Sequence, residues 1–320
     1  MRIPAQSLAV ALGQGGLVLD GGLSNQLADQ GQDLSDELWS ARLLADDPDQ
    51  ILAAHRAYLR AGAQVLITSS YQATFQGFAQ RGIDHGKAAE LLRRSVDLAR
   101  QAGRRAARAG EAGRTSASAG ETGGQDGLPW VAASVGPYGA MLADGSEYRG
   151  RYGLTVAELE RFHRPRIEVL AQAGPDVLAL ETVPDSDEAQ AMLRAAEGTG
   201  VPLWLSYTID GAATRAGQPL ADAFALVAGN DQVIAVGVNC CAPRDALPAI
   251  ELARAVTGKP VVVYPNSGEQ WDGTTRSWSG AGTFAPGLVR SWRAAGAALI
   301  GGCCRVGPAE IGALAAALAT

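Results

Sequence analysis

Positive charge is scarce in this sequence. Lys and Arg together number 27 against 33 Asp and Glu, which gives a formal net charge of −6, and the only lysines are Lys87 and Lys259. Binding to nucleic acid depends on a basic surface that neutralises phosphates. The composition therefore argues against a nucleic-acid partner.

Long apolar segments are also lacking. No uninterrupted apolar run reaches the roughly 18 residues that a membrane-spanning helix needs. Near the amino terminus, the apolar stretch SLAVAL is shorter than the core of a signal peptide, and glycines follow it. We therefore expect no membrane contact and a cytoplasmic location.

Cysteine and histidine are few. Four cysteines in 320 residues do not make a disulfide framework, and no C-x-x-C spacing suggests a redox dithiol. In a reducing compartment, clustered cysteines are more often metal ligands or catalytic groups. His55, His85 and His163 all fall in or beside helical segments, so we expect structural roles for them.

The sequence does contain a repeated unit, in which a short apolar run is followed by a longer amphipathic segment. Continuous apolar runs, unlike alternating ones, are typical of strands buried on both faces. Eight such runs are candidate strands: 17–22, 65–70, 130–135, 177–183, 203–208, 233–239, 260–265 and 298–302.

Helical patterns separate these runs. They cover 47–62, 87–103, 155–174, 187–198, 219–229, 244–257, 285–296 and 308–319. Eight alternating units indicate a (β/α)8 TIM-type barrel as a single domain. A doubly wound open sheet is the alternative, but DGGLSN after the first run is not the GxGxxG loop that such a sheet usually carries.

One segment departs from this pattern. Residues 103–127 are rich in Gly, Ala, Ser and charge and contain almost no large apolar residue. Burial cannot offset the entropy lost on ordering such a segment. We therefore expect one barrel over 1–320, with a flexible surface insertion at 103–127 that plays no part in the chemistry.

All four cysteines fall at the carboxyl ends of two predicted strands, where the active site of a barrel lies. Cys240 and Cys241 end the sixth strand, and Cys303 and Cys304 end the eighth. Only one strand separates these two in a closed barrel, so their thiolates could converge on one zinc ion. The preceding Gly-Gly pair would let the chain turn so that both Cys303 and Cys304 reach the metal.

Three protein thiolates would leave one zinc position open, which is typical of a catalytic site. Such a site suits the binding of another thiol as a thiolate. Three alternatives remain at this point: cysteines packed in the core, a redox dithiol, and a structural zinc held by four cysteines. Cys241, which should point away from Cys240, is expected to pack in the core.

Two carboxylates also stand at strand ends, Asp20 and Glu181. They could bind a substrate ammonium group, while the backbone N–H groups of Gly21 and Gly22 could hold a carboxylate. Together these groups would describe an α-amino acid site. Helix capping or an ion pair with a loop arginine is the alternative for both acids.

With these residues in view, the chain resembles the homocysteine S-methyltransferase family, in the branch that uses S-methylmethionine or S-adenosylmethionine. The matching segments cover nearly the whole chain outside 103–127. They are DGGLSNQLADQG, DLSDELWSA, AGAQVLITSSYQATFQGF, ASVGPYGAMLADGSEYRG, FHRPR, ALETVPD, VGVNC, VVYPNSGEQWD and LIGGCCR. The pairing of GVNC with GGCC is the most specific of these signals.

The resemblance implies particular roles for several residues. The zinc ligands of the family fall on Cys240, Cys303 and Cys304, and Cys241 lies outside the ligand set. Homocysteine would be held by Glu181 and the Asp20–Gly22 turn, Asn239 would support the site, and Thr68 and Ser70 would line the pocket.

In one place the sequence departs from the family. After the aspartate-glycine turn the family often reads Ala-Thr-Glu-Leu-Glu, whereas Ser24-Asn25-Gln26-Leu27-Ala28 stands here. The missing acid leaves the charge of the donor pocket open.

The sequence thus predicts zinc-dependent transfer of a methyl group from a sulfonium donor, with S-methylmethionine preferred, to the thiol of homocysteine. Tyr71, Trp271 and Trp278 could hold the sulfonium by cation–π contacts, with ordinary loop packing as the alternative. Other functions remain open: S-adenosylmethionine, betaine or a methylated selenium compound as donor, selenocysteine as acceptor, or a non-catalytic barrel that binds zinc or an amino acid.

Overall fold

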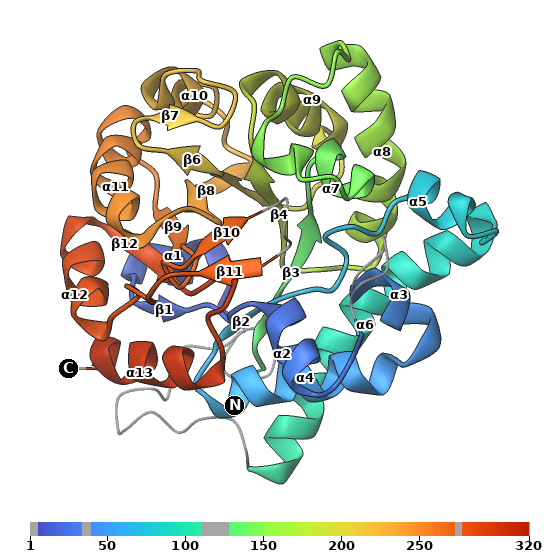
Figure 1. Ribbon diagram of the computed structural model, residues 1–320, viewed down its shortest axis with the longest axis horizontal. Coiled ribbons are helices and arrows are strands. Elements are labelled where there is room, and N and C mark those ends of the chain that lie inside the picture. Colours follow the sequence, from blue (N-terminus) through green and yellow to red (C-terminus); the bar gives the residue numbers. More distant parts are fainter. Residues whose placement is uncertain (1–5, 34–39, 111–127, 273–276, 320) are drawn as a thin grey trace.

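Eight parallel strands form the centre of the computed structural model, which describes residues 6–33, 40–110, 128–272 and 277–319 (Figure 1). Their order in the sheet is β1-β12-β9-β8-β5-β4-β3-β2. The strands are β1 (Leu17–Val18), β2 (Val65–Ile67), β3 (Trp130–Val135), β4 (Val177–Val183), β5 (Leu203–Tyr207), β8 (Val233–Asn239), β9 (Val261–Tyr264) and β12 (Ala297–Ile300).

The sheet closes on itself between its first and last strands. A parallel bridge joins Leu19 to Val65, and the amide of Gln64 donates to the carbonyl of Val18 at 2.8 Å. All eight predicted strands are present, and the predicted (β/α)8 barrel is confirmed. A doubly wound sheet would have left two open edges.

Both faces of the barrel strands are buried, which explains their unbroken apolar runs. Side chains such as Val131 and Leu178 point outward into the core beneath the helices, while Trp130 and Val177 point into the barrel. Residues of α1 (Leu8–Gln14) pack against the inner set and plug the amino-terminal end of the barrel.

Helices surround the sheet, and each strand of the barrel is followed by at least one of them before the next barrel strand begins. The longer ones are α4 (Pro48–Arg60), α6 (His85–Ala109), α8 (Val156–Gln172), α9 (Ser186–Ala196), α11 (Pro243–Thr257), α12 (Pro286–Ala295) and α13 (Pro308–Ala319). The shorter ones are α2 (Leu23–Asp29), α3 (Ser40–Asp46), α5 (Phe75–Gln80), α7 (Tyr138–Leu142), the 3-10 turn η2 (Ser146–Tyr148) and α10 (Leu220–Ala225). A Thr155–Glu158 capping box begins α8.

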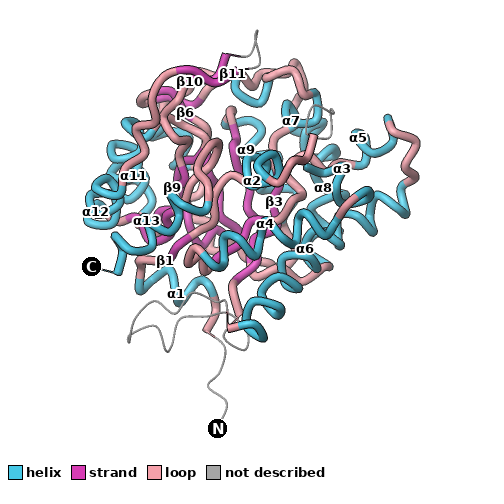
Figure 2. The backbone as a smooth tube through the Cα atoms, turned by 60° about the horizontal axis from the view of Figure 1, so that its bottom comes forward, coloured by secondary structure: helices cyan, strands magenta, loops and turns pink. Residues whose placement is uncertain are grey.

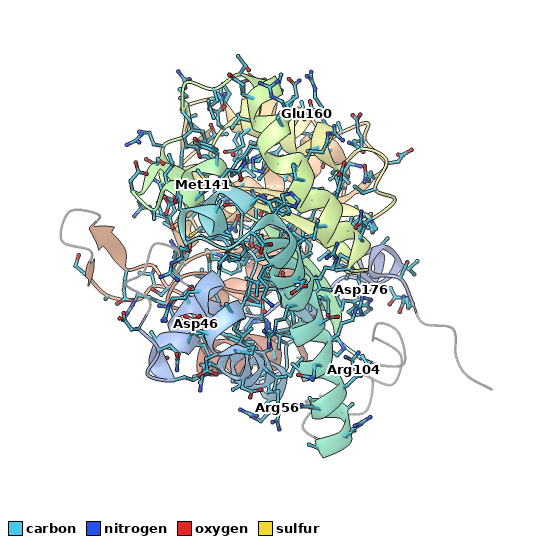
Figure 3. All side chains as sticks on the ribbon, turned by 90° about the vertical axis from the view of Figure 1, so that its right-hand side faces the viewer. Asp46, Arg56, Arg104, Met141, Glu160 and Asp176 are labelled. Atoms are coloured by element: carbon cyan, nitrogen blue, oxygen red, sulfur yellow. The ribbon has the colours of Figure 1, made fainter. Side chains whose placement is uncertain are left out.

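The predicted insertion at 103–127 begins too early. Helix α6 continues through Arg104, labelled near its end in Figure 3, and stops only where Gly110 adopts a left-handed conformation. Gly103 and Ala106 lie on the buried face of α6, so small apolar residues were enough to continue the helix. The rest of the predicted insertion, 111–127, lies outside the described residues.

Two hairpins lie at the end of the barrel opposite α1. Figure 2 shows the hairpin of β10 (Gln270–Asp272) and β11 (Ser277–Ser279) at this end, together with β6 (Ile209–Asp210), which pairs with β7 (Ala213–Thr214). They stand over the carboxyl ends of the strands, where a barrel carries its site. None of the described helices is both long enough and apolar enough to span a membrane.

Candidate metal centre and substrate cavity

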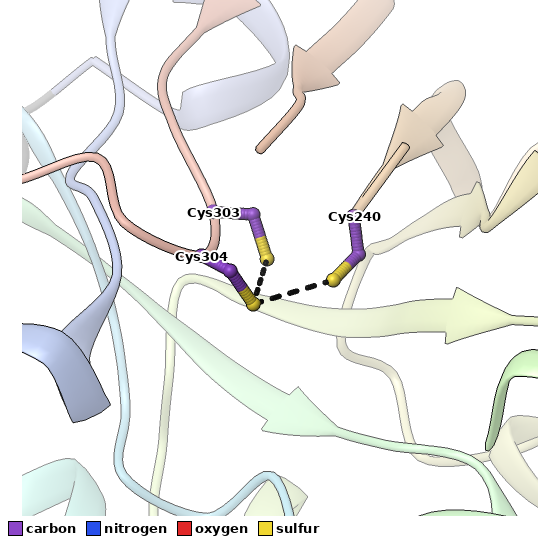
Figure 4. A group of neighbouring side chains, drawn as sticks. All are labelled: Cys240, Cys303 and Cys304. Atoms are coloured by element: carbon purple, nitrogen blue, oxygen red, sulfur yellow. Dashed lines mark hydrogen bonds between the residues drawn. The ribbon is translucent and has the colours of Figure 1, made fainter. Parts of the chain in front are cut away.

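Three cysteine sulfurs converge at the carboxyl ends of β8 and β12 (Figure 4). The Sγ of Cys304 lies 3.6 Å from that of Cys240 and 4.0 Å from that of Cys303. All three sulfurs lie within 4.8 Å of one another. The strand-end cysteines are thus brought together as predicted from their positions in the sequence.

These separations fit a tetrahedral metal site. With Zn–S bonds of about 2.3 Å, two thiolates on one tetrahedral zinc stand about 3.8 Å apart. Hydrogen bonds from Cys240 and then Cys303 lower the pKa of the Cys304 thiol well below its ordinary value. Three convergent thiols of this kind suit a soft-ligand divalent metal and leave a fourth position for another ligand.

The glycines before Cys303 let the chain turn out of the strand. Strand β12 ends at Ile300, and a Cβ on Gly301 would lie 2.6 Å from the carbonyl oxygen of Asp20. A Cβ on Gly302 would lie 2.1 Å from a methyl carbon of Val306. Only glycine allows this close approach, which directs both Cys303 and Cys304 toward Cys240.

On the other side of the cluster, the backbone is held in an unfavourable conformation. Thr182 and Cys240 both have positive φ, at 56° and 50°. The Asn239 side chain accepts from the Thr182 amide at 2.8 Å and donates to its hydroxyl at 2.7 Å. Such strain persists only where the surroundings enforce it, and Asn239 provides part of that support.

Cys241 stands apart from the other three cysteines. Its side chain is fully buried in the core outside the barrel, and burial raises the pKa of its thiol. Its expected packing role agrees with this position. A structural zinc held by all four cysteines does not fit the arrangement.

The three ligand candidates line a cavity of about 140 Å³. Residues at or after the carboxyl ends of β1, β2, β3, β4 and β9, together with residues of η2, complete its wall. The lining residues include Gly21, Gly22, Ser24, Asn25, Thr68, Tyr71, Ser134, Glu147, Tyr148, Glu181, Thr182 and Tyr264.

Glu181 is the predicted acid that faces this cavity. It is 5% exposed and accepts a hydrogen bond from the Ser134 hydroxyl. Burial raises the pKa of its carboxyl to about 7, against the lowering effect of its hydrogen bonds. A carboxylate so poorly solvated gains from binding a cation.

Three predicted substrate contacts do not line the cavity and instead support its wall. Asp20 accepts from the Ile67 amide at 2.9 Å, and burial raises its pKa well above the ordinary value. Ser70 donates to the Ser134 carbonyl at 2.8 Å. Asn239 fixes Thr182, as described above.

Gly21 and Gly22 line the cavity, where their backbone N–H groups were predicted to hold a substrate carboxylate. The Gly22 amide donates to the Val306 carbonyl at 2.9 Å, so it is not available to a substrate carboxylate. The turn packs so closely that a Cβ on Gly21 would lie 2.3 Å from the same carbonyl oxygen.

Two residues of η2 that sequence reasoning did not single out lie beside the cysteine cluster. The Tyr148 hydroxyl is 3.2 Å from the Sγ of Cys240. Glu147 is 3% exposed, and burial raises the pKa of its carboxyl to about 7. Both residues fall within the ASVGPYGAMLADGSEYRG match, which was the available signal.

The remaining residues considered in the sequence are the three aromatic candidates for sulfonium binding and the three histidines. Tyr71 lines the cavity, whereas the side chains of Trp271 and Trp278 lie outside the described part of the structure. His55 and His163 are fully buried in α4 and α8. His85 begins α6 and stacks on Phe75, with ring centroids 4.1 Å apart.

Comparison with known proteins identifies the family. Residues 17–318 match the sequence model of the homocysteine S-methyltransferase family. The chain is 45% identical to homocysteine S-methyltransferase of Escherichia coli over 94% of both chains. It is 46% identical to homocysteine S-methyltransferase 4 of Zea mays, over 94% of this chain and 89% of the maize protein.

A solved structure extends the likeness to three dimensions. The metallated form of the homocysteine methyltransferase MmuM from Escherichia coli superimposes with a TM-score of 0.81 at 43% identity. The match covers 94% of this chain and 95% of that one. The chain therefore belongs to the homocysteine S-methyltransferase family, and it is a methyltransferase.

Proposed function

We propose that this enzyme transfers a methyl group from S-methylmethionine to homocysteine and that Cys240, Cys303 and Cys304 hold the zinc ion it needs. The observation that carries the proposal is the meeting of three sulfurs, within 4.8 Å of one another, on the wall of a buried cavity. That the relative MmuM has been solved in a metallated form supports a bound metal.

When bound, zinc would favour the thiolate form of homocysteine by accepting its sulfur in the open position. Around that position, the chain supplies groups that suit an α-amino acid. Glu181 faces the cavity as an acceptor for the homocysteine ammonium group, and Ser134 fixes one of its oxygens. Thr68 adds a polar side chain to the cavity wall, and the backbone of Gly21 also lines it.

In the transfer itself, the homocysteine sulfur attacks the methyl carbon of the sulfonium donor, after its proton has passed to solvent. A new S–C bond forms, and the old S–C bond breaks with its electron pair left on the donor sulfur. Both products are then methionine. The residues of the cavity contribute mainly by holding two amino acids in line, which can supply a large part of the rate.

The Tyr148 hydroxyl contributes at the metal centre by its contact with Cys240. A hydrogen bond of this kind orients a ligand sulfur and moderates its charge. Because the ligands are free thiols, we also propose that the enzyme works in a reducing compartment, the cytoplasm.

The test is an assay of the reduced, zinc-loaded protein with S-methylmethionine and homocysteine deuterated on its carbon chain. Equal amounts of labelled and unlabelled methionine are expected by mass spectrometry, because one forms from each substrate. S-adenosylmethionine and betaine serve as comparison donors. If labelled methionine formed only with S-adenosylmethionine or only with betaine, that compound would be the methyl donor in place of S-methylmethionine. No methionine from any of the three donors would contradict the proposal.

A further inference from the structure

The cavity wall carries a second carboxylate for which the reaction described above has no use. Glu147 lines the same cavity as Glu181 and the three cysteines, and it is 3% exposed. Its Oε2 is buried without a hydrogen-bond partner. Within the described parts of the chain, no Lys, Arg or His forms an ion pair with it.

A buried acid without a partner costs the protein free energy unless a ligand pairs with it. The arginines beside η2 have other partners, since Arg149 lies 4.0 Å from Asp144 and Arg215 lies over the Tyr148 ring, 5.9 Å from its centroid. Asn25, which stands on the same wall where the family often has an acid nearby, accepts from the Arg305 amide at 2.7 Å.

The backbone holds Glu147 rigidly. A Cβ on Gly139 would lie 2.4 Å from the Glu147 nitrogen, so α7 and η2 pack with no space between them. The Ser146 amide donates to Asp144 at 2.9 Å, and the Gln72 side chain donates to the Ala140 carbonyl at 2.8 Å. A carboxylate on so fixed a backbone is organised before its ligand arrives, which lowers the entropic cost of binding.

We propose that Glu147 binds the ammonium group of the methyl donor and so selects an amino-acid sulfonium. The inference rests on the proposed function. Two substrates that are both α-amino acids bring two ammonium groups, and the cavity offers two buried carboxylates, Glu181 and Glu147.

The sulfonium itself is the poorer partner for Glu147. Its charge disappears as the methyl group moves, so a carboxylate beside it would stabilise the substrate more than the transition state. The ammonium charge stays unchanged through the reaction. A carboxylate on that group lowers the donor KM and leaves kcat alone.

The test uses Glu147→Gln and Glu147→Asp. We expect Glu147→Gln to raise the KM for S-methylmethionine at least tenfold, with kcat and the homocysteine KM within twofold of the parent values. Glu147→Asp keeps the charge on a shorter side chain, so its KM for S-methylmethionine should lie between those of the parent enzyme and of Glu147→Gln. Thermal stability should hold in Glu147→Gln, because no partner group is left unpaired.

Two controls sharpen this result. Glu160→Gln removes one carboxylate from the outer face of α8, where Glu160 is labelled in Figure 3, and should change neither KM. Dimethylsulfoniopropionate is a sulfonium without an ammonium group. Its kcat/KM should be the same with the parent enzyme and with Glu147→Gln.

An unchanged S-methylmethionine KM in Glu147→Gln would overturn the inference, as would a rise in the homocysteine KM instead. An equal loss with dimethylsulfoniopropionate would also overturn it, since Glu147 would then face the sulfonium. Calorimetric binding of S-methylmethionine separates this inference from the proposed function. Binding that Glu147→Gln weakens tenfold, without any turnover in the parent, would support Glu147 and contradict only the proposed reaction.

Discussion

At the scale of single residues, glycine decides how closely the chain packs around the cluster of Cys240, Cys303 and Cys304. A Cβ on Gly22 would lie 2.6 Å from the carbonyl oxygen of Cys303 and 2.7 Å from the side-chain oxygen of Asn25. Gly22 has a φ of −66°, which any residue can adopt, so its cost of substitution comes from this contact alone. Cys303 can therefore keep its position only because Gly22 has no Cβ.

We predict that Gly22→Ala displaces Cys303 and lowers zinc affinity roughly 10–100-fold, the usual effect of disturbing the support of a metal ligand. Competition with a chromophoric chelator measures the affinity. Gly287→Ala is the matched control, since nothing lies within 4 Å of its added Cβ. Unchanged zinc affinity in Gly22→Ala would contradict this account of the turn.

The sequence allowed the meeting of the three cysteines to be predicted because their positions follow from strand ends alone. Cys240, Cys303 and Cys304 each stand directly after an apolar run or its Gly-Gly extension. Glu147 and Tyr148 could not be found in this way, because they lie in η2, a single turn within the connection between α7 and α8. The path of such a loop depends on tertiary contacts that leave no periodic signal.

At the scale of elements, the segment that carries Glu147 and Tyr148 is fixed by a buried ionic network from α8 and α9. Arg166 donates to the Gly136 carbonyl, and the Tyr138 amide donates to Glu188 at 2.5 Å. His163 connects the two, 2.9 Å from Glu188 and 2.7 Å from Arg166. The FHRPR segment thus acts as support behind the cavity wall.

We predict that Arg166→Met lowers the free energy of unfolding by about 3–5 kcal/mol, because it leaves Glu188 buried without its cation. Arg164→Met, in the same segment, is the matched control. The Arg164–Glu160 pair is part-exposed, so its loss should cost no more than about 1 kcal/mol. Urea unfolding measures both, and equal losses would contradict the structural role of the network.

Long elements with a strong pattern were predictable, and short ones were not. All eight strands begin within one residue of the predicted start, although β1 ends at Val18, β2 at Ile67 and β12 at Ile300, short of the predicted 22, 70 and 302. There the chain leaves the ladder to form the site. Helices such as α1 and α2 have seven residues each, and tertiary packing rather than pattern stabilises helices this short.

At the scale of the whole molecule, barrel closure is what assembles the site. Cys240 follows β8 and Cys303 follows β12, more than sixty residues apart in sequence but separated only by β9 in the sheet. Sequence reasoning could foresee this meeting because a closed barrel fixes which strands are neighbours. It could foresee cavity residues at strand ends, such as Thr68 and Glu181, but not Glu147 and Tyr148, which come from η2.

The most direct test of the central claim is the zinc content of three reduced proteins, read together with methyl transfer to homocysteine. The account predicts about one zinc per chain and full activity in the parent and in Cys241→Ala, since Cys241 lies in the core. Cys303→Ala should lose both metal and activity. Full zinc and full activity in Cys303→Ala, or equal losses in Cys303→Ala and Cys241→Ala, would contradict a metal centre made by Cys240, Cys303 and Cys304.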